Sequence, residues 1–156
     1  MRILIVLAAV LLAACGSTAG TGCGSAVPAA VAGQGQPCGN AGRLSERIST
    51  DLTNYSPGST ITITVTVTNT STESCAAPTA CPPLPVAIDD ANGTQAWTTP
   101  NVRQVCPALA RLLQPGESVA YTGKASGVTL PTGVYSVTGS RADTVTAYGR
   151  SYFTVC

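Results

Sequence analysis

Histidine is absent from the sequence, and charged residues make up only 10% of its 156 residues. Without histidine there is no Ser-His or Cys-His nucleophile pair, no histidine-ligated metal and no side chain whose ordinary pKa suits general base catalysis near neutral pH. The eight basic and seven acidic residues give a formal net charge of +1, so no basic surface is available to neutralise the phosphates of a nucleic acid. We therefore expect no enzyme of these classes and no nucleic-acid partner.

Aromatic residues are also scarce, at 4%, although 44% of the residues are hydrophobic. Valine and threonine are abundant instead, a composition typical of short β-strands rather than of packed helices. The sequence therefore predicts an all-β protein.

Carboxylates that lie close together in the sequence are limited to Asp89 and Asp90, which precede Asn92-Gly93. Adjacent strand residues point to opposite faces, so these two carboxylates do not share one site. A calcium loop is the alternative, but its ligand spacing and closing glutamate are missing, and turn chemistry explains the segment better. We predict no catalytic, cofactor-binding or metal-binding residues, no cofactor and no small-molecule substrate.

The N-terminal segment has one basic residue, Arg2, followed by an apolar run over residues 3–14. The run is shorter than the roughly 20 residues that span a bilayer and fits the core of a signal peptide. It ends in Leu12-Ala13-Ala14-Cys15, which resembles the bacterial lipobox. This resemblance implies that residues 1–14 are a signal peptide and that Cys15 carries a thioether-linked diacylglycerol. The alternative is an ordinary secretory signal with a chance cysteine.

The signal peptide would export the protein. The lipid on Cys15 would anchor it to the bacterial cell envelope, on the outer face of the cytoplasmic membrane or in the outer membrane. Residues 15–42 are rich in Gly, Ala, Ser and Thr and show no periodicity. We interpret them as a flexible spacer between the anchor and the folded domain.

An even number of cysteines remains once Cys15 is acylated: Cys23, Cys38, Cys75, Cys81, Cys106 and Cys156. In an exported chain these six residues predict three structural disulfides. The spacing of the cysteines does not determine which of them pair. A zinc site is the alternative, but it would lack both histidine and a Cys-x-x-Cys pair.

Residues 61–68 alternate strictly between Ile or Val and Thr, which predicts a half-buried strand of an antiparallel sheet. Turn signals at Pro57-Gly58, Asn92-Gly93 and Pro115-Gly116 separate further short strands. Residues 43–52 also fit a helical spacing, and we interpret them as an irregular first strand. We therefore predict that residues 43–156 form an immunoglobulin-like antiparallel β-sandwich of about seven strands.

Gly133-x-Tyr135 at the start of a predicted strand resembles the tyrosine corner of immunoglobulin-like sandwiches. In that motif the tyrosine hydroxyl forms a hydrogen bond with backbone a few residues upstream. The alternative is an ordinary, half-buried strand tyrosine.

The order of these segments resembles the intracellular proteinase inhibitor (BsuPI) family over residues 60–140. Four elements carry the resemblance: Asn69-Thr70-Ser71, Gly93 with Trp97, Pro115-Gly116-Glu117-Ser118 and Pro131-x-Gly133-x-Tyr135. It implies a sandwich fold and a protein-binding, inhibitory activity, but the intracellular target of that family does not carry over to an exported chain. In similar proteins from high-GC bacteria the cysteines equivalent to Cys75 and Cys106 often face each other, which implies this bridge. A local Cys75–Cys81 bridge is the rival.

The segment CAAPTACPPLP, residues 75–85, combines prolines and cysteines that would stiffen a loop of small residues. Stiffness lowers the entropy lost on binding, so we expect a recognition loop that contacts a partner through Ala76, Ala77, Thr79 and Leu84. An ordinary inter-strand loop is the alternative. The function predicted is a membrane-anchored protein-binding module whose partner is a protease or another envelope protein. The alternative function is a structural or assembly component of the envelope without inhibitory activity.

Overall fold

The computed structural model describes residues 27–38, 42–77, 86–100, 111–139 and 149–156. These ranges are all-β, as predicted, and they contain no helix long and apolar enough to cross a membrane. The strands are β1 (Gly33–Cys38), β2 (Gly42–Thr50), β3 (Asn54–Tyr55), β4 (Ile61–Asn69), β5 (Cys75–Ala76), β6 (Val86–Asp90), β7 (Gln95–Thr98), β8 (Leu112–Leu113), β9 (Ser118–Ala125), β10 (Gly133–Gly139) and β11 (Arg150–Val155). They outnumber the seven expected for two reasons. Strands β3, β5 and β8 have two residues each, too few to show an alternating pattern, and β1 lies in the segment expected to be a spacer.

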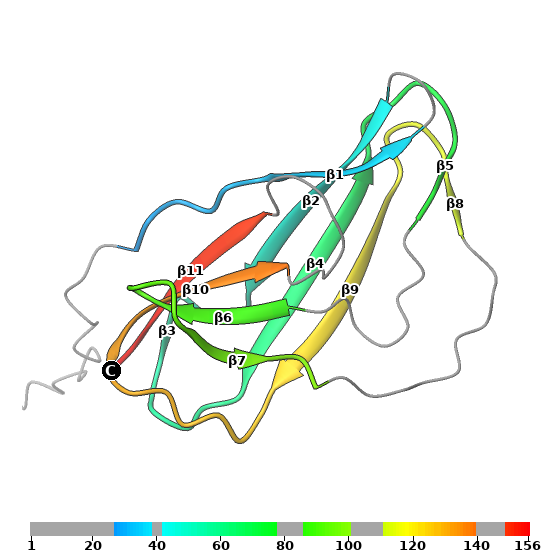
Figure 1. Ribbon diagram of the computed structural model, residues 1–156. Helices are drawn as coiled ribbons and strands as arrows, with labels where there is room; N and C mark the ends of the chain where they lie inside the picture. The colour runs from blue at the N-terminus through cyan, green and yellow to red at the C-terminus, as the bar shows by residue number, and fades with distance from the viewer. Residues whose placement is uncertain (1–26, 39–41, 78–85, 101–110, 140–148) are drawn as a thin grey trace, which may run out of the picture.

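The strands form two larger sheets and one small ribbon (Figure 1). The first sheet has the order β1-β2-β4-β9, the second has the order β3-β11-β10-β6-β7, and β5 pairs with β8 alone. All of these pairs are antiparallel except β3 with β11. The chain leaves β2, crosses to the second sheet and lies beside β11 in the same direction, which is the one departure from the expected antiparallel pairing.

Strand β4 confirms the predicted alternation. Ile61, Ile63, Val65 and Val67 are buried, and the threonines between them are half-buried on the other face. Strands β2 and β9 flank β4 over nearly its whole length. This central position pairs both edges of β4, and its apolar face is covered by the core to which the second sheet also contributes.

Residues 42–50 form a regular strand rather than an irregular strand or a helix. Leu44 and Ile48 are both buried, which agrees with a period of two as well as with a helical period. Leu52, the third residue of the helical spacing, lies beyond the end of β2 and is 55% exposed. The helical interpretation therefore depended on a residue that does not belong to the core.

Strand β1 lies inside the segment that was expected to be a flexible spacer, so that expectation is wrong for residues 33–38. It pairs with the edge of β2, with a register shift between Gln34 and Pro37. Pro37 has no N–H to donate, and an edge strand with a bulge is where proline is tolerated. The strand forms because β2 offers a pairing edge, which a local hydrophobic pattern does not reveal.

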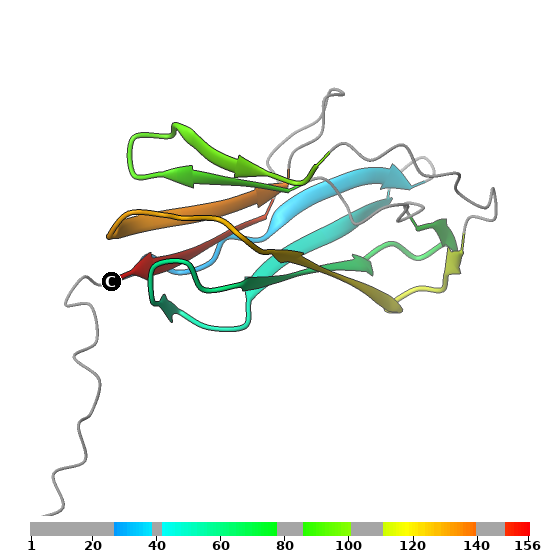
Figure 2. The same ribbon diagram turned by 90° about the horizontal axis from the view of Figure 1, so that it is seen from below.

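Both larger sheets contribute side chains to one buried core, and β2 packs against β11 (Figure 2). Phe153, the single phenylalanine of the chain, is fully buried in this core. The ring of Tyr55 meets it edge-on at a centroid distance of 5.3 Å, and the ring of Tyr135 stacks on it at 5.5 Å. A core with few aromatics therefore concentrates three of them at one point.

The two ends of the domain differ in what they contain (Figures 1 and 2). The C-terminus lies at one end, together with loops 51–60 and 126–132, and both views place the first described residues, 27–30, toward it. We name this the terminal end. Strands β5 and β8 lie at the opposite end, which we name the β5–β8 end.

Tyr135 forms the hydrogen bond that the tyrosine-corner interpretation predicts. Its hydroxyl donates to the carbonyl of Pro131 at 2.8 Å, and the residue is 5% exposed rather than half-buried. This bond ties the loop before β10 to the core at the terminal end.

Tyr55 ties a second loop of the terminal end. Its hydroxyl donates to Asp51 Oδ1 at 2.6 Å and accepts the N–H of Leu52 at 3.0 Å. Burial, with the bond to the Asp51 carboxylate, raises the pKa of Tyr55 to about 12. The same bond lowers the pKa of Asp51.

The raised pKa of Tyr55 predicts a loss of stability at alkaline pH. The pKa of about 12 in the folded state lies above the ordinary value of 10.0. The contribution of Tyr55 to the free energy of unfolding is therefore complete below pH 10 and is lost as the pH rises through 12. Tyr55→Phe removes the titrating hydroxyl, so the free energy of unfolding should fall less steeply between pH 10 and 12 than in the wild type. Chemical unfolding at a series of pH values measures this, and equal slopes would contradict it.

Gly149 permits a close approach of the chain before β11 to β1 and β2. A Cβ at this position would lie 2.8 Å from the carbonyl oxygen of Glu46 and 3.3 Å from the amide nitrogens of Gly33 and Ile48. All three are backbone atoms, so no side-chain rotation relieves the contact.

Gly149→Ala should therefore lower the free energy of unfolding by about 1–3 kcal/mol, the usual cost of overpacking. Thr122→Ala, an exposed change on β9, is the control and should stay within about 0.5 kcal/mol of the wild type. Denaturant unfolding compares the three proteins. Equal stability of the Gly149 variant and the control would show that the backbone contact is not tight.

Candidate functional site

The structure places only part of the predicted recognition loop. Ala76 lies in β5 and is exposed, whereas Thr79 and Leu84 fall outside the described residues. Ala77 is 4% exposed and belongs to the core, and its N–H donates to the carbonyl of Arg111 at 2.7 Å. The prediction that Ala77 contacts a partner is therefore wrong, because its small side chain faces inward.

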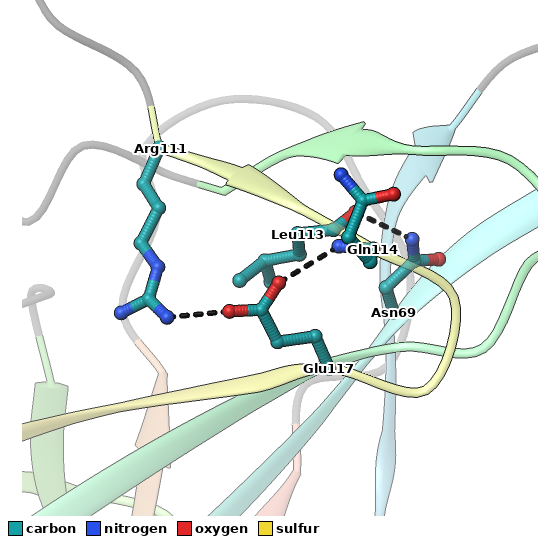
Figure 3. Close-up of polar contacts among 5 residues, drawn as sticks. All are labelled: Asn69, Arg111, Leu113, Gln114 and Glu117. Atoms are coloured by element: carbon teal, nitrogen blue, oxygen red, sulfur yellow. Dashed lines mark hydrogen bonds and ion pairs between the residues drawn. The ribbon is translucent and has the colours of Figure 1, made fainter.

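The β5–β8 end is organised by the side chain of Asn69, the last residue of β4, which is fully buried. Its Nδ2 donates to the carbonyl of Glu73 at 2.7 Å. The same nitrogen donates to the carbonyl of Leu113 at 2.9 Å (Figure 3). Its Oδ1 accepts the N–H of Ser71 at 2.9 Å and the hydroxyl of the same serine at 2.7 Å. One amide therefore joins the segment after β4 to strand β8.

The backbone of Asn69 makes a second set of bonds to the same region. Its N–H donates to the carbonyl of Glu117 at 2.9 Å, and its carbonyl accepts the N–H of Gly116 at 2.8 Å. Strand β4 is thus fastened to the turn between β8 and β9. The two motifs that carried the family resemblance here, Asn69-Thr70-Ser71 and Pro115-Gly116-Glu117, are partners in one network.

The turn itself is closed as its sequence predicts. Gly116 has a φ of 80°, which favours glycine, and the N–H of Glu117 donates to the carbonyl of Gln114 at 2.9 Å. The Glu117 carboxylate accepts the N–H of Gln114 through Oε2 at 2.9 Å and pairs with Arg111 through Oε1 (Figure 3). The bond from Gln114, followed by the one from Arg111, lowers the pKa of Glu117.

The two leucines of strand β8 differ in exposure. Leu113 is fully buried in the core, whereas Leu112 is 60% exposed. Successive side chains of a strand point to opposite faces, so when Leu113 is buried, Leu112 is exposed to solvent. Sequence reasoning missed Leu112, and the signal that was available is the pair of leucines directly before a Pro-Gly turn.

Cys75 packs beside the Asn69 amide, with its Sγ 3.1 Å from Asn69 Oδ1. Cys75 and Cys156 are both disulfide-bonded, so this sulfur has no proton to donate and the approach is a packing contact. The described residues leave the partner of each cysteine open, and Cys15, Cys23, Cys81 and Cys106 lie outside them. Pairing of Cys75 with Cys106, and the rival pairing with Cys81, remain predictions.

The loop between β6 and β7 is closed by the side chain of Asp90. Asp90 Oδ1 accepts the N–H groups of Asn92 and Thr94, each at 2.8 Å, and Gly93 has a φ of 78°. The backbone of Asp90 donates to Thr94 across the loop at 2.9 Å. The turn predicted at Asn92-Gly93 is confirmed, and it lies in residues 91–94, which join β6 to β7.

Trp97 lies in β7 and is partly buried against the core, so its aromatic ring has a packing role. Within the described ranges no group of three or more Cys, Asp or Glu side chains is placed to hold a metal ion.

The β5–β8 end therefore offers two things to a partner: backbone hydrogen-bonding groups held in an extended conformation and the apolar side chain of Leu112. No pair of acid, base or nucleophilic side chains converges among its described residues, whose one ion pair is the exposed contact between Arg111 and Glu117.

Comparisons with known proteins give one distant structural similarity to report. No family model and no curated protein matches the chain. Among solved structures, the crystal structure of the C-terminal domain of wzt is similar to it, with 13% sequence identity and a TM-score of 0.42, over 83% of this chain and 79% of that one.

Removal of the buried Asn69 amide should lower the stability of the folded state. Asn69→Ala leaves the carbonyl of Leu113 and the N–H of Ser71 without the partner they have now, and an unsatisfied buried group costs about 1–3 kcal/mol. We expect a loss of at least about 2 kcal/mol in the free energy of unfolding. Thr68→Ala, the half-buried neighbour in β4, is the matched control and should cost less than about 1 kcal/mol. Denaturant unfolding measures both, and similar values would contradict the role of Asn69.

Proposed function

We propose that the chain is an exported, lipid-anchored protein whose larger sheets form an immunoglobulin-like sandwich that binds another protein, and that this partner is a protease. The Leu12-Ala13-Ala14-Cys15 motif supports the anchor. The core shared by the two sheets and the Tyr135 bond to Pro131 support the sandwich. The resemblance to the intracellular proteinase inhibitor family supports the class of partner.

The observation that carries this proposal is the rigid β5–β8 end. Asn69 fastens β4, the segment after it and β8 to one another, and Glu117 closes the adjoining turn. A binding surface that is already ordered loses little conformational entropy when a partner docks, so more of the contact energy appears as affinity.

The position of this end also suits a tethered binding protein. Residues 27–30 lie toward the terminal end (Figure 1), so an anchor at Cys15 would hold that end nearer the membrane. The β5–β8 end would then face away from the bilayer, where a partner in the surrounding compartment can reach it.

Inhibition of secreted serine proteases tests the proposal. The full chain, purified in detergent micelles, should inhibit an elastase-like or a subtilisin-like protease at micromolar concentration or below. The Asn69→Ala variant should inhibit less well, because a loosened β5–β8 end costs more entropy to order. Progress curves with a chromogenic peptide measure both. Full protease activity in the presence of the wild-type protein would contradict protease binding.

A structural or assembly role in the envelope is the second candidate, favoured by the outward face of β4 and β9. Hydroxyls form cross-strand contacts there, with Thr68 Oγ1 2.8 Å from Ser118 Oγ and Thr64 Oγ1 3.3 Å from Thr122 Oγ1. Lys124 is the one charged side chain of β9. Cross-linking in intact cells would capture an envelope protein on this face, whereas a protease inhibitor would be captured through the β5–β8 end.

A further inference from the structure

We propose that the outer edge of β8 is the strand that docks on the partner, with Leu112 as the side chain that enters the partner's main pocket. The partner class that fits is a serine endopeptidase that binds its substrates as extended strands and accepts leucine. This inference rests on the proposed function and adds to it the residues that recognise the protease.

The hydrogen-bond pattern of the β5–β8 ribbon sets the direction of the backbone groups of Leu112. In this antiparallel pair Ala76 lies opposite Leu112, and Cys75 lies opposite Leu113. The N–H of Ala77 donates to the carbonyl of Arg111 at 2.7 Å, so Ala77 and Arg111 form a hydrogen-bonded pair. Because hydrogen-bonded and non-hydrogen-bonded pairs alternate, the N–H and C=O of Leu112 point away from β5.

Those outward groups are what a docking strand requires. Among the described residues β8 pairs with β5 alone, so its other edge has no described strand beside it. A protein that takes an extended segment into its binding cleft pairs main chain with main chain and reads alternate side chains in pockets. The outward N–H and C=O of Leu112 supply the first kind of contact, and its side chain, 60% exposed, supplies the second.

The residues on each side of Leu112 are held in place. The carbonyl of Arg111 accepts the N–H of Ala77, and the carbonyl of Leu113 accepts Asn69 Nδ2. The N–H of Gln114 donates to Glu117 (Figure 3). Leu112 is therefore presented on a backbone that is already extended, which favours binding.

Charge contributes little at this edge. Arg111 is exposed but paired with Glu117, and Leu112 has no charged neighbour in β5. Association should then depend only weakly on ionic strength, in contrast to complexes formed by electrostatic steering. Selectivity would come from the pocket that receives leucine.

Two exposed leucines at opposite ends of the domain provide a matched test. Leu112→Asp in the full chain should raise the inhibition constant for a subtilisin-like protease by about 30-fold or more, the loss typical of a central anchor residue. Leu52→Asp, at the terminal end and 55% exposed, is the control and should change it by less than about 3-fold. The unfolding midpoints of both variants should match the wild type, since both side chains are exposed.

A second pair of variants tests the backbone separately from the side chain. Leu112→Ala removes the anchor but keeps the outward N–H, whereas Leu112→Pro removes both. Because that N–H points away from β5, proline leaves the ribbon's own bonds intact. The proline variant should inhibit at least about 5-fold less well than the alanine variant if main-chain pairing contributes a hydrogen bond.

The outcomes separate the two proposals. Inhibition by the wild type that Leu112→Asp leaves unchanged would overturn the β8 edge as the docking strand and leave protease binding standing. Equal losses for Leu112→Asp and Leu52→Asp would also overturn it, because recognition would then not be local to the β5–β8 end. A wild-type protein that inhibits no serine protease would overturn both proposals.

Discussion

The buried amide of Asn69 is the constraint on which the β5–β8 end depends. An amide in an apolar core is stable only when its donors and acceptor are satisfied, and here Nδ2 uses both hydrogens and Oδ1 accepts twice. Satisfying them fixes where β8 lies relative to β4. The position of Leu112 follows, because Leu113 is held by Asn69 from one side and by the core from the other. A polar residue inside the core therefore determines which apolar residue remains outside it.

The parts of the fold that sequence reasoning predicted correctly are those with a local physical signature. Strand β4 alternates between Ile or Val and Thr over residues 61–68, so its apolar face can be predicted without knowledge of its neighbours. The turns at Gly93 and Gly116 both need a positive φ, which glycine in these dipeptide contexts signals. The bond from Tyr135 to Pro131 also spans only four residues. Each of these features is determined within a short window of the chain.

What was missed depends on contacts between distant segments. Strand β1 forms on the edge of β2 despite glycine, glutamine and proline in its sequence. The ribbon of β5 and β8 joins segments about 37 residues apart, and neither strand is long enough to show a period. The inward orientation of Ala77 follows from that pairing, as does the outward orientation of Leu112. Of the residues predicted to contact a partner, Ala77 is therefore buried, Ala76 is exposed in β5, and Thr79 and Leu84 lie outside the described residues.

The scarcity of charge and the absence of histidine also shape how this protein can recognise anything. A surface with few ionisable groups has little electrostatic steering, and a chain without histidine has no ordinary switch between pH 5 and 8. The docking that we propose at β8 would therefore rely on shape, on apolar contact and on backbone hydrogen bonds. Leu112 is exposed there, and its neighbour Arg111 is held by the bond from Ala77. Main-chain recognition is largely independent of sequence, so the choice of partner would be made by that single side chain and by the rigidity behind it.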